Sequence, residues 1–247
     1  MKVITITNRK GGTAKSETTK AIAGGLYLKG YKVLMIDLDA QANLTIITGA
    51  KTDGKTVKDF LNGDSGLAEL IQSTEAGDII AASPLLYDTG KLSPYTLQKG
   101  LKHLKDYDFI LIDTAPAFSP LNAAAMIASD AVIVPSQADI LGLQALKEIK
   151  DEVESVKEYN KALKILGVCI TRYTNNRISK DMAASLKAVA DIIGTKLYNT
   201  PIRENVAIKE AAALHRSIYK YAPRSNGAKD YMALTEEILQ DLKEKGK

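Results

Sequence analysis

Asn8-Arg9-Lys10-Gly11-Gly12-Thr13-Ala14-Lys15-Ser16 stands between an apolar run typical of a strand, residues 3–7, and a segment of helical period, residues 17–29. At such a junction the backbone N–H groups and the dipole of the helix favour an anion. The two glycines allow backbone conformations and a close approach that side chains would block. The sequence therefore predicts a phosphate-binding loop at this place.

This loop departs from the ordinary pattern G-x-x-x-x-G-K-[ST], because Ala14 stands where the second glycine is expected. It fits K-G-G-x-x-K-[ST], in which Lys10 is an additional lysine. We expect Lys15 to reach the terminal phosphates and the Ser16 hydroxyl to ligate Mg²⁺. The alternative is a glycine turn that merely joins the strand to the helix.

Two further apolar runs end in aspartate. Asp37 and Asp39 close the run that begins at residue 33, and because residues i and i+2 of a strand point to the same side, both can face the phosphates. Asp113 closes the run 109–112 and is suited to hold Mg²⁺ through a water. The alternative, in which each aspartate caps a helix, suits one of them but fits three together poorly.

Apolar runs of strand length alternate with segments of helical period along most of the chain. The expected strands are residues 3–7, 32–37, 79–82, 109–113, 131–135 and 163–171. The expected helical segments are residues 17–29, 57–61, 67–72, 95–104, 121–129, 141–158 and 231–242. This rhythm predicts an α/β fold with a doubly wound, mostly parallel sheet, that of a P-loop NTPase. We see no repeat or linker and predict a single domain spanning residues 1–247.

Composition restricts the class of protein. Hydrophobic residues make up 45% and charged residues 25%, which is typical of a soluble globular chain and excludes disordered or membrane-spanning ones. Cys169 is the only cysteine, so a multi-thiolate metal site is excluded, and a reducing cytoplasm is expected. Residues 161–247 contain 16 Lys/Arg and 9 Asp/Glu, within a chain of net charge +4. That excess is either a footprint for DNA or a solvated surface.

Five stretches of the sequence together resemble the ParA-type plasmid or chromosome partition ATPases of the ParA/MinD deviant Walker A family. They are the phosphate loop, I-D-L-D-A-Q-A-N-L-T at 36–45, D-T-A-P at 113–116, and the C-terminal patterns at 202–211 and 221–228. The resemblance spans nearly the whole chain. Since the chain starts at the first strand, it resembles the small form without an N-terminal helix-turn-helix domain, and operator-specific repression is not expected.

The resemblance implies an ATP hydrolase, slow without its partners, that dimerises around two ATP molecules with Mg²⁺. Lys10 would act in trans on the phosphates of the other subunit, and Asp39 would orient the attacking water. Lys15 would bind phosphates in its own subunit, and Asp113 would support through a water the Mg²⁺ held by Ser16. The implied ATP-binding residues are Lys10, Gly11, Gly12, Thr13, Ala14, Lys15, Ser16, Glu17 and Asn205, the last matching the position that recognises adenine.

In this family the ATP dimer binds double-stranded DNA without sequence preference, and a ParB-type centromere-binding protein stimulates hydrolysis and release. The resemblance thus implies a cytoplasmic protein that is nucleoid-associated when ATP-bound. That it does not bind membranes is predicted from residues 242–247. Phosphate contact calls for basic side chains, and the candidates are Arg177, Lys180, Arg203, Lys209, Arg216, Lys220, Arg224 and Lys229. Arg224 is the first choice because it lies in the segment that resembles the family's DNA-facing region.

Glu17 stands where the family usually has threonine, and Ala14 and Ala40 replace the commoner Gly and Pro. The Glu17 carboxylate either repels nucleotide or faces solvent in a helical turn that favours an acid. If it weakens binding, Glu17→Thr should bind nucleotide more tightly. Three other functions stay open: a MinD-like membrane-positioning ATPase, a metabolic P-loop ATPase, and a switch that does not hydrolyse ATP. The first is disfavoured because residues 242–247 contain one large apolar side chain.

Overall fold

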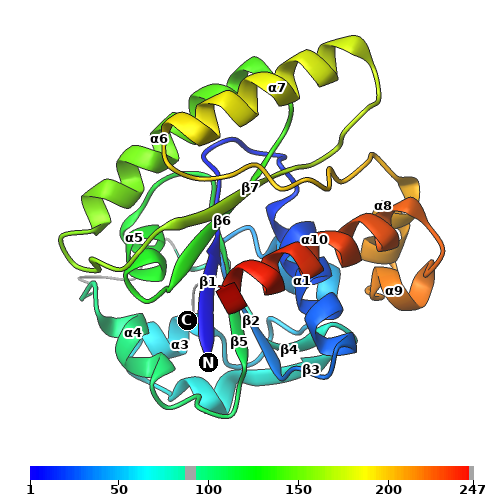
Figure 1. Ribbon diagram of the computed structural model, residues 1–247. Coiled ribbons are helices and arrows are strands. Elements are labelled where there is room, and N and C mark those ends of the chain that lie inside the picture. The colour runs from blue at the N-terminus through cyan, green and yellow to red at the C-terminus, as the bar shows by residue number, and fades with distance from the viewer. Residues whose placement is uncertain (87–92, 245–247) are drawn as a thin grey trace.

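The computed structural model describes residues 1–86 and 93–244 and has a sheet at its centre (Figure 1). Within these residues the sheet has seven strands in the order β3-β4-β2-β5-β1-β6-β7. The strands are β1 (Lys2–Ile6), β2 (Val33–Leu38), β3 (Ile71–Thr74), β4 (Gly77–Ile80), β5 (Phe109–Thr114), β6 (Ala131–Ser136) and β7 (Ile165–Ile170). All neighbours pair in parallel except β3 and β4, which are antiparallel.

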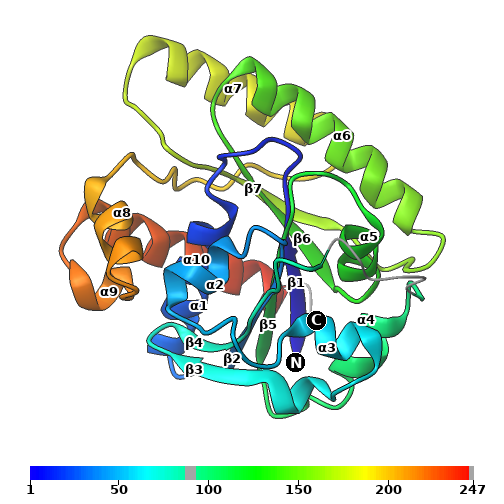
Figure 2. The same cartoon turned by 180° about the vertical axis from the view of Figure 1, so that it is seen from behind.

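Helices cover both faces of this sheet. They are α1 (Lys15–Leu28), α2 (Asn43–Thr48), α3 (Val57–Asn62), the 3₁₀ turn η1 (Leu67–Leu70), α4 (Thr96–Leu101), α5 (Pro120–Ile127), α6 (Ile140–Val156), α7 (Arg177–Ile192), α8 (Val206–Ala213), α9 (Ile218–Tyr221) and α10 (Asn226–Glu244). One face packs against α1, α2 and the C-terminal helices α8–α10, and the other against α3–α7 (Figures 1 and 2). The predicted doubly wound α/β fold is confirmed.

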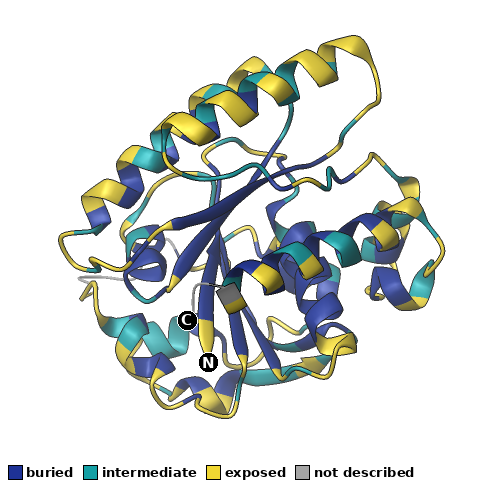
Figure 3. Ribbon diagram, in the orientation of Figure 1, coloured by how far each residue is buried: buried dark blue, intermediate teal, exposed yellow. Residues whose placement is uncertain are grey.

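Side chains of the central strands alternate between the two hydrophobic cores on the opposite faces of the sheet. Ile4 and Ile6 of β1 join the core under α1 and α10, whereas Val3 joins the core on the opposite face. Because both faces are covered, the middle strands are buried along nearly their whole length, as Figure 3 shows. No helix within residues 1–86 and 93–244 is both long and apolar enough to cross a bilayer.

Most predicted elements lie within a few residues of the observed ones, but one is wrong. Residues 67–72 were expected to be helical, and they form the short turn η1 followed by the edge strand β3. The helices α2, α7, α8 and α9 were not predicted. The final helix begins at Asn226, five residues earlier than expected, and residues 245–247 of the predicted basic end lie outside the described residues.

Strand order determines where a ligand can bind. Strand β1 lies between β5 and β6. The chain passes from β1 to β2 on the β5 side and later from β5 to β6 on the other side, so the direction of winding reverses at β1. In open α/β sheets a crevice forms at that reversal, beyond the carboxyl ends of the strands. The predicted loop, Asp39 and Asp113 all follow or close strands at this edge.

Candidate functional site

The loop between β1 and α1 is shaped as a cradle. Gly12 has φ +73° and Ala14, the residue before α1, has φ +61°, so the chain turns sharply into the helix. A Cβ built on Gly11 or Gly12 would meet no atom within 4 Å, which leaves open space beside the backbone. No side chain of the described residues caps the first turn of α1, so its N–H groups are available to an anion. The geometry fits a bound phosphate chain.

Two side chains that the sequence interpretation missed hold this loop. Asn8 is fully buried; its Nδ2 donates to the Pro135 carbonyl at 2.7 Å and its Oδ1 accepts from the Lys10 N–H at 2.9 Å. Thr171, just after β7, donates through Oγ1 to the Thr13 carbonyl at 3.0 Å. The loop is therefore tied to β6 and β7, through partners far away in sequence.

Lys15 lies at the floor of the cradle. Its side chain is buried and its Nζ donates to the Asn8 carbonyl at 3.3 Å. Burial lowers the pKa of Lys15, while the carboxylates of Asp113 and Asp39 act in the opposite direction. Among the residues that the structure describes, this desolvated ammonium has a carbonyl as its direct partner, so it is well placed to bind phosphate oxygens.

The predicted metal residues Ser16 and Asp113 are brought together. The Ser16 hydroxyl donates to Oδ2 of Asp113 at 2.6 Å, and Oδ1 of Asp113 is buried with no hydrogen-bond partner among residues 1–86 and 93–244. Burial, reinforced by the charge of Asp37, raises the pKa of Asp113 well above its ordinary value. A hydroxyl beside an unsatisfied carboxylate oxygen suits the hydrated shell of Mg²⁺. In the described part of the chain no three His, Cys, Asp or Glu side chains could hold a metal by themselves, so such an ion would take its remaining oxygens from phosphates and water.

The two carboxylates near the end of β2 have different surroundings. Asp37 is fully buried, and its oxygens are taken up inside the chain: they accept hydrogen bonds from the Thr45 N–H and hydroxyl, both at 2.8 Å, and from the Asp39 N–H at 3.0 Å. Asp37 thus anchors the start of α2, and burial raises its pKa to about 6. Asp39 accepts from the Gln41 N–H at 3.0 Å and contributes to the charge around Lys15. Of the two, Asp39 keeps the predicted position beside the cradle.

Lys10 is paired inside its own chain. Its Nζ donates to Oε1 of Gln137 at 2.7 Å and to Oδ2 of Asp139. Gln137 also donates to the Gly12 carbonyl at 3.2 Å, and Asp139 caps the N-terminus of α6 by accepting from the Gly142 N–H. In the single chain the additional lysine is therefore held by the segment that joins β6 to α6.

Asn205 and Glu17 line one cavity next to the loop. The cavity lies between the first turn of α1, represented by Ala14 and Glu17, and the segment that leads to α8. Oδ1 of Asn205 caps α8 by accepting from the Ala207 N–H at 2.9 Å, which leaves its amide group for other contacts. The structure thus brings Asn205 to the predicted nucleotide site, and Glu17 lines that site rather than only facing solvent.

The predicted DNA-binding residues fall into two groups. Arg203 is held by Asp230 through Nε at 2.9 Å and Nη2 at 2.5 Å. Further ion pairs join Arg216 and Lys220 to Glu75 (3.6 and 3.8 Å), Lys209 to Glu204 (3.6 Å) and Arg177 to Asp181 (4.0 Å).

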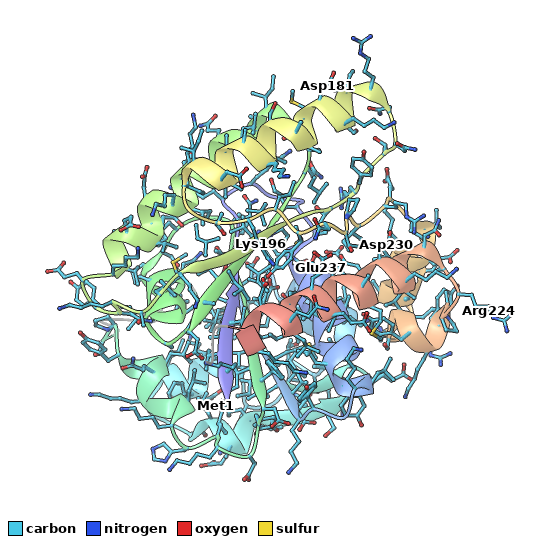
Figure 4. All side chains as sticks on the ribbon, viewed as in Figure 1. Met1, Asp181, Lys196, Arg224, Asp230 and Glu237 are labelled. Carbon is cyan, nitrogen blue, oxygen red and sulfur yellow. The ribbon has the colours of Figure 1, made fainter. Side chains whose placement is uncertain are left out.

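Arg224 and Lys229 are exposed and make no ion pair within residues 1–86 and 93–244. Figure 4 shows Arg224 extending away from the body of the protein, whereas Asp181, at the start of α7, lies at a distant tip. The first choice among the candidates is thus free to contact a polyanion, and the α7 residues Arg177 and Lys180 do not share its location.

A lysine-rich phosphate loop at the reversal point of a parallel sheet, with Ser16 touching Asp113 of the neighbouring strand, defines a P-loop ATPase. Residues 1–165 match the family described as an AAA domain. The chain is 32% identical to the chromosome-partitioning ATPase Soj of Thermus thermophilus, over 98% of this chain and 96% of that protein. It is 30% identical to the chromosome partitioning protein ParA of Caulobacter vibrioides, over 97% and 94%. The chain belongs to the ParA family of partition ATPases.

Solved structures share this fold. Cobyrinic acid a,c-diamide synthase from Mycobacterium smegmatis, with bound ADP and magnesium, superposes with a TM-score of 0.85 at 26% identity and covers 98% of this chain and 96% of that one. The septum site-determining protein MinD from Pyrococcus horikoshii, complexed with Mg-ADP, gives a TM-score of 0.81 at 28% identity, over 96% and 95%. Relatives of this fold therefore include both positioning and metabolic proteins.

Proposed function

We propose that this chain is an ATP-dependent DNA partition ATPase acting as a single domain in the cytoplasm. The observation that carries the proposal is the convergence of Lys15, Ser16, Asp39 and Asp113 on the loop at the carboxyl edge of the sheet. The full-length similarity to proteins named as chromosome-partitioning ATPases supports the biological role.

We assign a role to each of these side chains. Lys15 neutralises the terminal phosphates, and the loop N–H groups hold their oxygens. Ser16 and Asp113 would hold Mg²⁺, directly and through a water, and the ion would neutralise charge that develops on the phosphates. Asp39, beside Lys15 and close to the loop, orients the attacking water.

Lys10 couples the site to dimerisation. In the single chain it is bound by Gln137 and Asp139, so it can reach the phosphates of a second subunit only after these contacts open. A cation that arrives with the partner supplies transition-state charge only in the dimer. Hydrolysis removes the phosphate that holds the dimer together, and the nucleotide acts as a switch.

DNA binding by the ATP dimer would use the segment that contains Arg224 and Lys229, two exposed cations without ion pairs in the described chain. Two chains bring two such segments together, which raises affinity through multivalency. A ParB-type protein bound at a centromere would stimulate hydrolysis and release, and the ATP-bound dimer would associate with the nucleoid.

The proposed cycle is tested by measuring molecular mass in solution with Mg-ADP and with Mg-ATP. We expect the wild-type chain to become a dimer with ATP only, Lys15→Ala to stay monomeric, and Asp39→Ala to form the dimer without hydrolysing ATP. Lys157→Ala, whose side chain pairs with Glu154 on α6 away from the loop, is the control. A wild-type chain that binds ATP and stays monomeric would contradict the proposal.

Two alternatives have specific support. The similarity to MinD favours a membrane-positioning ATPase, and the similarity to the diamide synthase favours a metabolic enzyme of the same fold. Sedimentation with vesicles of anionic phospholipid tests the first: ATP-dependent binding that persists at salt concentrations that abolish DNA binding would favour a membrane-positioning ATPase, because basic side chains alone bind such vesicles only electrostatically. Failure to bind DNA in any nucleotide state, with ATP hydrolysis intact, would favour the second.

A further inference from the structure

Arg172 has an unusual backbone conformation beside the nucleotide cavity. It follows β7 and has φ +51°, in the left-handed region that disfavours side chains other than glycine. Such strain persists only where the surrounding structure enforces it, and it is concentrated at ligand sites. Neither the phosphate loop motif nor the adenine-recognition position includes this residue.

The residues on both sides of Arg172 are fixed. Thr171 donates through its N–H to the Ser136 carbonyl at 2.8 Å and through its hydroxyl to the Thr13 carbonyl at 3.0 Å. Tyr173 donates its N–H to the Ile202 carbonyl at 2.9 Å and accepts from the Glu204 N–H at 3.1 Å. Arg172 is therefore held between the phosphate loop and the segment that leads to Asn205.

Arg172 is exposed and is one of the residues that line the same cavity as Ala14, Glu17 and Asn205. Its guanidinium makes no ion pair or hydrogen bond with the residues the structure describes, although the carboxylates of Glu17 and Glu204 line this cavity too. The adjacent arginine in the cavity behaves differently, since Arg203 is locked onto Asp230. Arg172 thus brings an uncommitted positive charge to the nucleotide site.

Glu17 brings the opposite charge to the same place. It lies in the first turn of α1, where a phosphate chain would bind, and an unbalanced carboxylate there repels phosphates. We propose that Arg172 is a nucleotide-binding residue that offsets Glu17: with nucleotide in the cavity, its guanidinium binds phosphate oxygens and neutralises the Glu17 carboxylate. This inference rests on the proposed ATP-binding function. The planar fork of arginine suits both oxyanions at once.

A double-mutant cycle tests the proposal, with Mg-ADP binding measured by calorimetry. The chains are the wild type, Arg172→Met, Glu17→Thr, the double variant, and Arg177→Met as a control whose side chain is 95% exposed. We expect Arg172→Met to weaken binding roughly tenfold, as the loss of a charge-assisted contact does. In the Glu17→Thr background the same change should cost less than about threefold. Arg177→Met should bind like the wild type.

A further variant separates binding from folding. Arg172→Gly removes the side chain and relieves the left-handed backbone, so it should melt above the wild type without nucleotide and yet bind Mg-ADP as weakly as Arg172→Met. Wild-type affinity in Arg172→Met would overturn the proposal, and so would a loss of equal size with and without the Glu17→Thr substitution. A wild-type chain that binds no Mg-ADP at all would instead overturn the proposed ATPase function.

Discussion

Ala14 has a side chain where the backbone favours glycine. Its φ of +61° lies at the turn into α1, and the left-handed conformation costs a residue with a Cβ about 1–2 kcal/mol. Alanine offsets about 0.4–1 kcal/mol of this cost, because it restricts the unfolded chain more than glycine does. The phosphate loop of this chain is therefore more strained than its glycine form would be.

We expect Ala14→Gly to raise the free energy of unfolding by about 0.5–1 kcal/mol, since the relief of strain exceeds the added entropy of the unfolded chain. Thermal and urea unfolding without nucleotide measure the effect. Ala21→Gly, in the buried middle of α1, is the control and should destabilise. A lower stability of Ala14→Gly would mean that the left-handed turn is not strained.

Asp139 has two functions that one substitution separates. Asparagine caps a helix as well as aspartate does, so Asp139→Asn keeps the cap on α6 and removes the charge that holds Lys10. We expect Asp139→Asn to dimerise at an ATP concentration about two- to fivefold lower than the wild type requires. This factor is the free energy of about 0.5–1 kcal/mol that a partly exposed ion pair contributes. Glu154→Gln, which frees Lys150 and Lys157 on the same helix, is the control. Dimerisation that needs more ATP would contradict this role of Asp139.

Some site residues have a local signature and others do not. Lys15 and Ser16 could be predicted because the loop pattern itself carries the chemistry, and Asp113 because it closes an apolar strand. Asn8 and Asp139 bind partners 127 and 129 residues away, so no short pattern reveals them. The sequence also could not show that the Asp37 carboxylate accepts hydrogen bonds from Thr45, because that contact depends on where α2 lies relative to the end of β2.

Helix α6 is the element that holds the start of the phosphate loop. Near its N-terminus Asp139 binds Lys10, and further along it Glu152 and Glu148 approach the Arg9 Nε at 3.2 and 3.7 Å. Glu152 is 7% exposed, and its Oε1 has no hydrogen-bond partner within residues 1–86 and 93–244. Burial is the largest cause that raises the pKa of Glu152 to about 7, against the opposing charge of Arg9.

This raised pKa predicts how stability varies with pH. The folded chain keeps the Glu152 proton up to about pH 7, whereas the unfolded chain releases it near the ordinary value of 4.5. The free energy of unfolding therefore falls as the pH rises between these two values. Glu152→Gln cannot ionise, so it should melt near the wild type at pH 5 and above it at pH 8. Melting curves across this range measure the difference, with the exposed Glu158→Gln as control. A variant that melts below the wild type at pH 8 would show that the ion pair to Arg9 outweighs burial.

Elements were predictable to the extent that they are buried. The central strands form continuous apolar runs because helices cover both faces of the sheet. Helix α7 was not predicted although Ile178, Met182, Leu186 and Val189 recur at helical spacing, and only Leu186 and Ala190 of its sixteen residues are buried. Residues 67–72 mislead because their apolar spacing suits a helix, and the edge strand β3 forms only by antiparallel pairing with β4.

At the scale of the whole molecule, positive charge is less available than the sequence count suggests. The excess of basic residues in 161–247 includes Arg216 and Lys220, which share Glu75, and Arg203, which is bound to Asp230. Exposed pairs of this kind are weak, so DNA phosphates can compete for the first two but less readily for the bidentate Arg203. Arg224 and Lys229 are among the exposed cations of this part of the chain that make no ion pair within residues 1–86 and 93–244, and contact with DNA would start from them.

Binding to non-specific double-stranded DNA, measured without nucleotide and with ADP, ATP or a slowly hydrolysed ATP analogue, tests the central claim most directly. We predict binding only with ATP or the analogue, steeply reduced by salt, abolished by Lys15→Ala and weakened by Arg224→Ala. Lys55→Ala, an exposed lysine paired with Glu69, should bind like the wild type. A wild-type chain that binds ATP and dimerises, but holds DNA equally in every nucleotide state or not at all, would contradict the account.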